Sequence, residues 1–179
     1  MSVKPAETEP VPCGKLGTEA TKRLRDIGLF GGLTDEVLAH FGGALELIEI
    51  GPGAMVFKEG DSGREMYVVL EGEMEVLRRS KRNTEARVAI LGPGDWFGEM
   101  SILDIMPRSA TVRVIAPSRL LRLTTQDLDA LYRRDLKSYS LLVLNIAREI
   151  SRRLRVADGL LAELVANVMD EYARPRSGG

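Results

Sequence analysis

Glycine and proline are spread so unevenly along this chain that they divide it into two structural regimes. Thirteen of the 18 glycines lie between Gly28 and Gly98, whereas residues 118–174 contain one glycine and no proline. Both residue types mark turns and interrupt regular elements. The middle of the chain is therefore predicted to form short strands joined by turns, and the last third is predicted to be helical.

The middle region contains seven runs of strand length that are rich in β-branched residues. Turn signals such as Gly72 and Ala116-Pro117 separate these runs. Short strands at this spacing are typical of an antiparallel sandwich or a jelly-roll barrel. We therefore predict a mainly β fold with flanking helices, in which residues 44–124 form an antiparallel β-roll. The seven runs are residues 45–50, 54–57, 66–72, 73–77, 86–91, 110–115 and 119–123.

Helices are expected on both sides of the β-roll. Residues 19–43 are predicted to form two short helices, the first over residues 19–27. Residues 125–172 are predicted to form hinge, lid and dimer helices, which begin with a helix at 125–134 capped by Thr124. A longer helix follows from residue 137 to residue 172.

The long helix carries a regular apolar seam, which we define by eight residues at alternating spacings of four and three. Such a repeat is typical of a coiled-coil interface, so it predicts a homodimer through residues 137–172. The alternative is a helix folded back onto its own barrel. A second apolar stripe suggests that both faces are used. The seam consists of Val143, Ala147, Ile150, Leu154, Ala157, Leu161, Leu164 and Val168, and the stripe of Ile146, Leu160, Val165 and Met169.

The ends and the composition of the chain exclude several classes of protein. Residues 1–18, which hold three prolines, and residues 173–179 are predicted to be disordered tails. No apolar run approaches the roughly 20 residues that cross a bilayer, and the first residues do not form a secretory signal, so a cytoplasmic protein is expected. A single cysteine (Cys13) and a single histidine (His40) argue against an internal disulfide and a zinc site.

Charge gives no case for bulk attraction to nucleic acid, because 25 basic residues face 26 acidic ones. A basic cluster does lie across residues 133–155. It is interpreted as a solvated helix face, with attraction of an acidic partner or of nucleic acid as the alternative.

The segment most informative about function is GDWFGEMSILDIMPRSATV, residues 94–112. Gly98 is expected to end a strand and to open a short helical turn, whose free N–H groups form an anion site. Glu99 would repel an anion there unless it accepts hydrogen bonds from hydroxyl groups next to that anion. Arg108 follows Pro107 and is expected to place its guanidinium group at the same anion site. These features indicate a site for a phosphate attached to a sugar. The segment lacks a nucleophile with a base, so binding is expected and not catalysis.

This segment resembles the phosphate-binding cassette of the cyclic nucleotide-binding domain family, with FGE and PRSAT at the spacing found in regulatory subunits of the cAMP-dependent protein kinase. The resemblance extends over residues 22–158 and includes GAMVFKEGD (53–61) and YVVLEGEMEV (67–76). SRRLRV, at 151–156, is more similar to the dimer helix of catabolite-activator-type regulators. The resemblance implies a cyclic nucleotide as ligand, and no further cofactor.

The family pattern implies a role for each matching residue. Backbone N–H groups of the cassette would surround the phosphate and ribose, Glu99 would hold the ribose 2′-hydroxyl, and Arg108 would pair with the cyclic phosphate. The residue after the arginine is often threonine in cGMP-selective members, so Ser109 favours cAMP, with cGMP possible. The cassette residues are Gly98, Glu99, Met100, Ser101, Arg108, Ser109 and Ala110, and the apolar wall for the base consists of Val88, Leu91 and Phe57.

The chain departs from the regulator pattern in two ways. No helix-turn-helix domain follows the long helix, so no direct DNA binding is expected and a separate protein effector is predicted. Ala157 and Asp158 occupy positions where those regulators carry hydroxyl residues that meet the adenine. Arg153, Arg155 or Asp158 would then act as the lid over the base. Two alternatives stay open: an ion pair between Glu99 and Arg108 that merely closes a turn, and a ligand-free scaffold with a dimerising helix.

Overall fold

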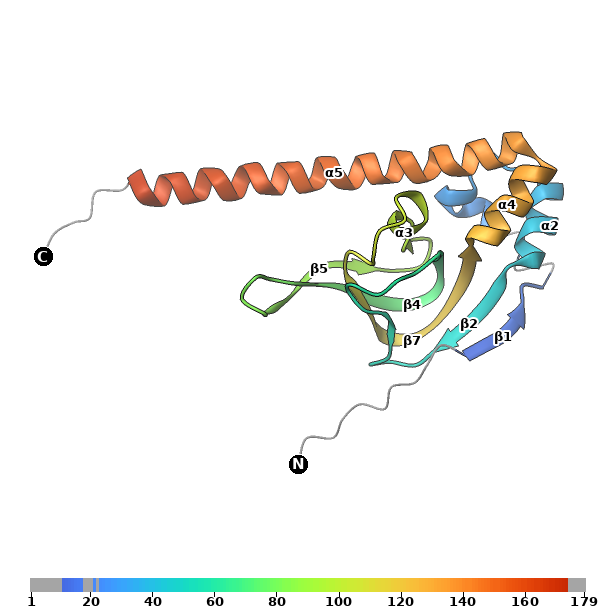
Figure 1. Cartoon of the computed structure of the whole chain (residues 1–179), viewed down its shortest axis with the longest axis horizontal. Coiled ribbons are helices and arrows are strands. Elements are labelled where there is room, and N and C mark those ends of the chain that lie inside the picture. The colour runs from blue at the N-terminus through green and yellow to red at the C-terminus, as the bar shows by residue number, and fades with distance from the viewer. Residues whose placement is uncertain (1–10, 18–20, 22, 174–179) are drawn as a thin grey trace, which may run out of the picture.

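The computed structural model describes residues 11–17, 21 and 23–173, and its centre is an antiparallel β-roll (Figure 1). The main strand order is β1-β2-β7-β4-β5, and β3 and β6 pair with β7 and β4. The two longest strands, β4 and β7, pair along most of their length. The strands are β1 (Val11–Lys15), β2 (Glu46–Ile50), β3 (Met55–Phe57), β4 (Glu65–Arg79), β5 (Glu85–Leu91), β6 (Trp96–Phe97) and β7 (Thr111–Thr124).

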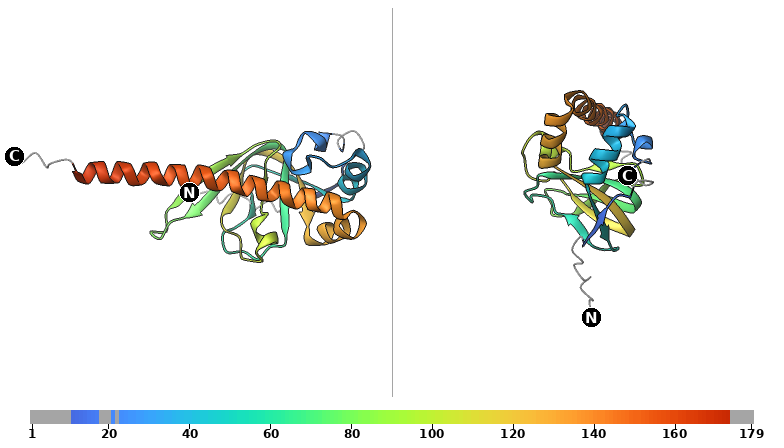
Figure 2. Two further views of the ribbon diagram at one scale, coloured as in Figure 1. Left: turned by 90° about the horizontal axis from the view of Figure 1, so that it is seen from above. Right: turned by 90° about the vertical axis from the view of Figure 1, so that its right-hand side faces the viewer.

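Helices flank the roll, and the last of them extends well beyond it. Its first half crosses the roll and its second half projects beyond it (Figures 1 and 2). No helix in the described ranges is long and apolar enough to cross a membrane. The helical elements are the 3₁₀ turns η1 (Leu24–Asp26) and η2 (Gly28–Phe30) and the helices α2 (Asp35–Ala44), α3 (Met100–Leu103), α4 (Thr125–Arg134) and α5 (Leu136–Ala173).

The mainly β fold with flanking helices is confirmed. Four of the predicted strand runs, however, join in pairs to form the two continuous strands β4 and β7. Gly72 and Ala116-Pro117 were predicted to be turns, and they are irregularities within β4 and β7, where the register between the strands shifts. Gly72 has a φ of 94°, and a Cβ there would lie 2.1 Å from Ser118 Oγ. Glycine therefore provides a bend that lets two long strands stay paired as the sheet curls.

The predicted N-terminal tail is wrong over part of its length. Residues 11–15 form β1, which pairs antiparallel with β2 and places Val11 opposite Glu49. The backbone hydrogen bonds of this pairing order a segment whose own side chains are exposed. Residues 1–10 and 174–179, predicted to be disordered, lie outside the described residues. In the region predicted as a helix over 19–27, the described part includes the 3₁₀ turn η1.

The helix predictions at the C-terminal end are confirmed. Thr124 and Asp127 form a capping box at the start of α4, as their spacing predicts. The first half of α5 packs onto its own roll, with Leu142 and Ile146 almost fully buried. Asn145 Nδ2 fixes this half further by donating to the carbonyls of Leu29 and Gly31, at 3.1 and 2.9 Å. The interpretation as a folded-back helix therefore holds for the proximal half, and the distal half is left exposed.

Candidate ligand-binding site

A cavity of about 440 Å³ lies between the segment from β6 to β7, the edge strand β5 and the middle of α5. This volume is within the usual range of small-molecule sites, roughly 300–1,000 Å³. All ten residues predicted as the core of the site line the cavity. They are Phe57, Val88, Leu91, Gly98, Glu99, Met100, Ser101, Arg108, Ser109 and Ala110.

One wall of the cavity is the short connection from β6 into α3. Gly98 has a φ of 84°, and a Cβ at this position would lie 2.7 Å from Arg108 Nη1. Glycine is therefore required here both by the backbone conformation and by the approach of the arginine. The N–H groups of Ile102 and Leu103 donate to Glu99 O, and those of Met100 and Ser101 precede them at the start of the helix. The first N–H groups of a helix have no acceptor within it, so they can serve a ligand.

Arg108 is the buried cation of the site. Its side chain is 2% exposed, and Nη2 donates to Glu65 Oε1 at 2.6 Å. Nη1 donates to Glu65 O at 2.7 Å and to Gly98 O at 3.1 Å. The guanidinium carbon lies 4.1 Å from the centre of the Phe57 ring, a cation–π arrangement. These contacts fix the orientation of the guanidinium before any ligand arrives.

Glu99 is the buried acid of the same wall. The residue is 5% exposed, and burial raises the pKa of its carboxyl group above the ordinary value of 4.5. The positive charge of Arg153 is the largest influence that lowers this pKa, and Arg153 Nη1 lies 3.4 Å from Glu99 Oε1. A buried carboxylate with one long ion-pair contact retains the capacity to accept further hydrogen bonds.

Glu99 and Arg108 do not pair with each other within the described part of the chain. Glu99 faces Arg153 and Arg108 faces Glu65. The alternative of a simple ion pair that closes the cassette turn is therefore wrong, because each residue has a partner from a distant element.

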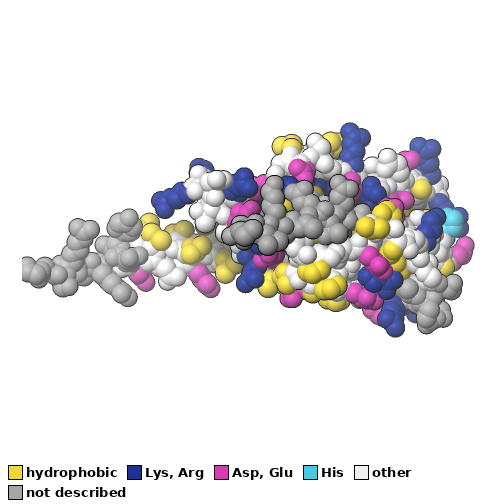
Figure 3. All heavy atoms as spheres, turned by 90° about the horizontal axis from the view of Figure 1, so that it is seen from below, with side chains coloured by type: hydrophobic (Ala, Val, Ile, Leu, Met, Phe, Trp, Pro, Cys, Tyr) yellow, Lys and Arg dark blue, Asp and Glu magenta, His cyan; other side chains and the backbone are white. Residues whose placement is uncertain are grey.

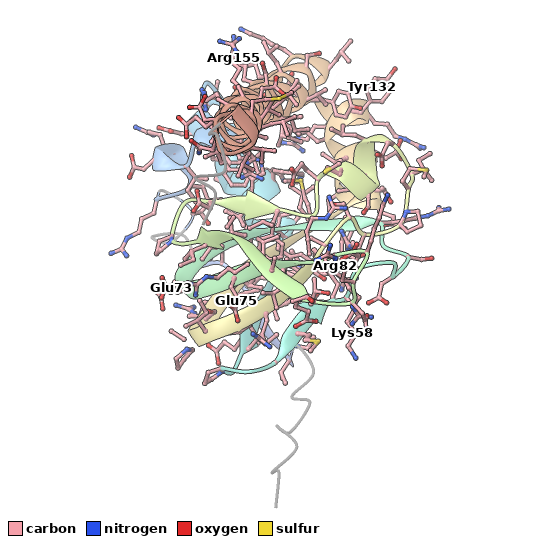
Figure 4. All side chains as sticks on the ribbon, turned by 90° about the vertical axis from the view of Figure 1, so that its left-hand side faces the viewer. Lys58, Glu73, Glu75, Arg82, Tyr132 and Arg155 are labelled. Atoms are coloured by element: carbon pink, nitrogen blue, oxygen red, sulfur yellow. The ribbon has the colours of Figure 1, made fainter. Side chains whose placement is uncertain are left out.

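The residues expected to form the lid fall into two groups. Arg153 lines the cavity; in addition to Glu99, its guanidinium contacts Trp96 O at 2.8 Å and Glu149 Oε1 at 3.1 Å. Arg155 and Asp158 are exposed and do not line the cavity. Figure 4 shows Arg155 on α5 pointing away from the β-roll. Of the residues predicted to form the lid, Arg153 alone therefore lines the cavity in this structure.

The opposite wall of the cavity is apolar and partly open. Phe57 and Phe97 lie with ring centres 5.7 Å apart, and Leu91 is buried beside them. Val88 and Ile90 on the edge strand β5 remain about half exposed. Trp96, next to Phe97, is part of the hydrophobic core.

Sequence reasoning missed several residues of the site. Val76, Ala89, Ile90 and Val112 complete the apolar lining. Glu65 and Glu149, which hold the two arginines, were also missed. Glu65 lies 43 positions before Arg108, and no local motif links the two. Glu149 could have been found from its spacing of four residues before Arg153, which is typical of helical ion pairs.

The chemistry available in this cavity is that of binding. It combines one buried cation, one buried acid and helix-start N–H groups on one side with an apolar wall on the other. Within the described ranges, no group of three or more His, Cys, Asp or Glu residues is placed to hold a metal ion.

Comparison with known proteins agrees with this geometry. Residues 47–135 match the family model of the cyclic nucleotide-binding domain. The chain is 40% identical over 106 residues to the "Cyclic AMP receptor protein" of Thermus thermophilus, a match that covers 59% of this chain and 47% of that protein. The chain therefore spans about half the length of this curated relative.

Solved structures show the same fold. A cyclic nucleotide-binding domain from Methylobacillus flagellatus superposes with a TM-score of 0.79 over 90% of this chain and 93% of that one, at 22% identity. The N-terminal domain of a transcriptional regulator from Streptomyces coelicolor superposes with a TM-score of 0.65 at 30% identity, over 74% of this chain and 92% of that domain. With the sequence motif, the β-roll and these matches in agreement, the chain belongs to the cyclic nucleotide-binding domain family.

Proposed function

We propose that this protein is a regulatory protein that binds a 3′,5′-cyclic nucleotide in the 440 Å³ cavity, cAMP in preference to cGMP. The observation that carries the proposal is the pair of buried charges, Arg108 and Glu99, on one wall of a cavity whose opposite wall is apolar. Each of these charges is held by one partner from a distant element and still faces the cavity, so their placement points to a ligand with complementary groups.

The cyclic phosphate occupies the space between Arg108 and the N–H groups at the start of α3. The guanidinium is already oriented by Glu65 and by the carbonyl of Gly98, so little side-chain entropy is lost on binding. The phosphate then shares the guanidinium of Arg108 with the carboxylate of Glu65.

Glu99 accepts a hydrogen bond from the ribose 2′-hydroxyl, and the base lies against the apolar wall that includes Val88 and Leu91. Two points favour adenine over guanine. Position 109 carries serine in place of the threonine that cGMP-selective relatives often have, and the Thermus relative is named for cyclic AMP.

Ligand binding is linked to α5 through Arg153. In the structure this residue joins α5 to Glu99 and to the carbonyl of Trp96. A ribose hydroxyl that donates a hydrogen bond to Glu99 competes with Arg153 for this carboxylate. The contacts of α5 therefore differ between the ligand-free and the ligand-bound protein. A ligand can shift such an equilibrium only by its difference in affinity for the two states, which is a few kcal/mol in typical allosteric proteins.

The distal half of α5 is proposed to dimerise and to signal to a separate effector protein. Leu154, Leu161, Leu164 and Val168 of the seam are each about 50–60% exposed. Figure 3 shows apolar side chains gathered on the part of the molecule that projects beyond the roll. Burial of each such side chain would stabilise a dimer by about 1.5–3 kcal/mol at most.

Calorimetric titration with cAMP and with cGMP tests the binding proposal, with Arg108→Ala beside the unaltered protein. The variant removes hydrogen bonds from a charged group, so we expect affinity to fall about 10- to 100-fold. Unchanged affinity in the variant would remove Arg108 from the site. No binding of either nucleotide, by folded protein free of carried-over ligand, would favour a scaffold with an empty cavity.

A further inference from the structure

A second cavity, of about 680 Å³, lies between the loop that follows β3, the hairpin that joins β4 to β5, and the start of β7. Seven of its eleven lining residues are charged, so a charged ligand suits it better than an apolar one. Four of the seven are cations, namely Lys58 of the loop and Arg78, Arg79 and Lys81 of the hairpin. Figure 4 shows Lys58 and Arg82, the next cation of the hairpin, on the same side of the roll.

The two arginines of this second cavity have hydrogen-bonding capacity to spare. The nearest carboxylate oxygens lie 3.9 Å from Arg78 Nη2, on Glu59, and 3.8 Å from Arg79 Nη2, on Glu85. Both distances exceed that of a hydrogen bond, so neither guanidinium has an acceptor within the described ranges. Lys81 has no ion-pair partner in the part of the chain that the structure describes. These cations can therefore turn to a ligand without breaking a short contact.

The hairpin that carries three of the cations is fixed by its own hydrogen bonds. Ser80 N donates to Thr84 O at 2.9 Å, Thr84 N donates to Ser80 Oγ at 3.1 Å, and Asn83 N donates to Ser80 O at 2.9 Å. Asn83 has a φ of 60°, a conformation that asparagine tolerates better than most residues. The backbone spacing of the cations is thus set before a ligand arrives, which lowers the entropy lost on binding.

Thr111 contributes a buried hydroxyl group to the same cavity. The residue is 9% exposed, and its Oγ1 accepts a hydrogen bond from Glu59 N at 2.9 Å. A hydroxyl group that accepts can also donate, so its proton is available to a ligand oxygen. The cavity therefore offers guanidinium, ammonium and hydroxyl donors together.

We infer that this second cavity binds a small polyphosphate, and that this ligand opposes the cyclic nucleotide through Arg78. Guanidinium groups match the geometry of phosphate oxygens, and several cations around one cavity suit several linked phosphates better than one. The cations line a concave space, which favours a small molecule over a nucleic acid strand.

The effect on the cyclic nucleotide rests on the proposed function, and Arg78 supplies it because this residue lines both cavities. The loop of the second cavity also holds the backbone of Arg108. Gly60 N donates to Arg108 O at 2.9 Å, and Arg108 N donates to Asp61 O at 2.8 Å. Two anions that share Arg78 compete for its charge. An exposed ion pair contributes roughly two- to fivefold to an equilibrium constant, so each ligand should weaken the other by about that factor.

The site is tested by calorimetric titration with tripolyphosphate in magnesium-free buffer, at an ionic strength where exposed charges act over only about 8 Å. Arg79→Gln removes charged hydrogen bonds and should weaken tripolyphosphate about tenfold. Arg82→Gln removes a cation of the same hairpin that does not line the cavity, so it should bind almost as before. Equal losses in the two variants would mean that the overall charge of the hairpin attracts the anion, and would overturn the cavity. A single-stranded oligonucleotide that bound more tightly than tripolyphosphate would overturn it as well.

Titration in the presence of cAMP shows whether the two ligands use different cavities. With separate cavities, rising cAMP should weaken tripolyphosphate by about two- to fivefold and then have no further effect. Competition for one cavity would weaken it without limit, and would overturn the second site. Arg78→Gln should abolish the mutual effect even when tripolyphosphate is raised until it saturates the variant. An effect that persists in Arg78→Gln would refute the role of Arg78.

The same titrations separate this inference from the proposed function. If tripolyphosphate binds and depends on Arg79 while cAMP does not bind, the proposed function falls and the second site stands. If cAMP binds but tripolyphosphate does not, or binds equally well to Arg79→Gln, the second site is refuted alone.

Discussion

The guanidinium of Arg108 lies against Glu65 through two contacts, 2.6 Å to a carboxylate oxygen and 2.7 Å to the main-chain carbonyl. Glu65 is the first residue of β4, and Arg108 lies just before β7, the strand that pairs with β4. The longest strand pair of the roll therefore sets the position of the cation. Any ligand phosphate must share Arg108 with Glu65.

Replacement of Glu65 by Gln should lower the free energy of unfolding and increase the thermal stabilisation that ligand binding provides. Removing one member of a buried ion pair leaves an uncompensated charge, so we expect the free energy of unfolding to fall by about 3 kcal/mol, the low end of the usual range because Glu65 is partly exposed. A bound phosphate restores the missing negative charge. The increase in thermal stability on adding cAMP should therefore be larger in Glu65→Gln than in the unaltered protein.

Glu75→Gln is the matched control for this experiment. Glu75 also lies on β4 and pairs with Arg113 at 2.6 Å, but neither residue lines the cavity (Figure 4 shows Glu75 on the sheet). This variant should lose stability without any change in the ligand-induced shift. An equal shift in both variants would mean that Glu65 acts only through the stability of the sheet.

Gly63 is predicted to matter through the space that it leaves for Arg108. A Cβ at this position would lie 2.4 Å from the guanidinium carbon, which is pinned by Glu65 and cannot easily move. We expect Gly63→Ala to displace the guanidinium and to weaken cAMP binding about tenfold, roughly the value of one charged hydrogen bond. Gly51→Ala has open space around the new methyl group and should bind as before. Calorimetry on both variants distinguishes them.

The sequence predicted which cassette residues lie together at the cavity, because the determinants of their placement are local. Gly98, Glu99 and Arg108 lie within eleven residues of one another, and the glycine, the helix start and the proline-linked arginine each have a local backbone reason. The helices at the C-terminal end were equally predictable, since caps and heptads are also short-range patterns.

The contacts that orient the cassette were not predictable, because they come from distant parts of the chain. Glu65 reaches Arg108 only through the pairing of β4 with β7, and Arg153 reaches Glu99 only through the packing of α5. The same limit explains the strand errors. The local sequence around Gly72 predicts a turn. In the structure Gly72 is a bend within β4, because β4 stays paired with β7 on both sides of it.

Stability and binding should both depend on the ionisation of Glu99, with opposite signs. Burial raises the pKa of this carboxyl above 4.5 in the folded protein, so the folded state binds its proton more tightly than the unfolded state. The contribution of Glu99 to stability should thus be most favourable below about pH 4.5 and decline as pH rises to the folded pKa. Urea unfolding across this window should show the decline in the unaltered protein and its absence in Glu99→Gln.

Affinity for cAMP should rise over the same window, because the ionised carboxylate is the stronger acceptor for the ribose hydroxyl. Calorimetry from about pH 4.5 to about pH 7.5 tests this. Affinity that rises equally in Glu99→Gln would assign the titration to another group.

Dimerisation should depend on the distal seam and leave the β-roll intact. Leu161 is 60% exposed in the distal half of α5, where residues 154–170 are exposed. Leu161→Asp would place charges at the centre of the proposed interface, at a cost of several kcal/mol if they were buried without partners. We expect this variant to be monomeric by sedimentation and to unfold at the same urea concentration once the dimer contribution is removed by dilution. Ala166→Asp adds the same charge on the outer face of the helix and should remain dimeric. If both variants dimerise like the unaltered protein, the seam has another role, and the long helix must then find its partner in a different protein.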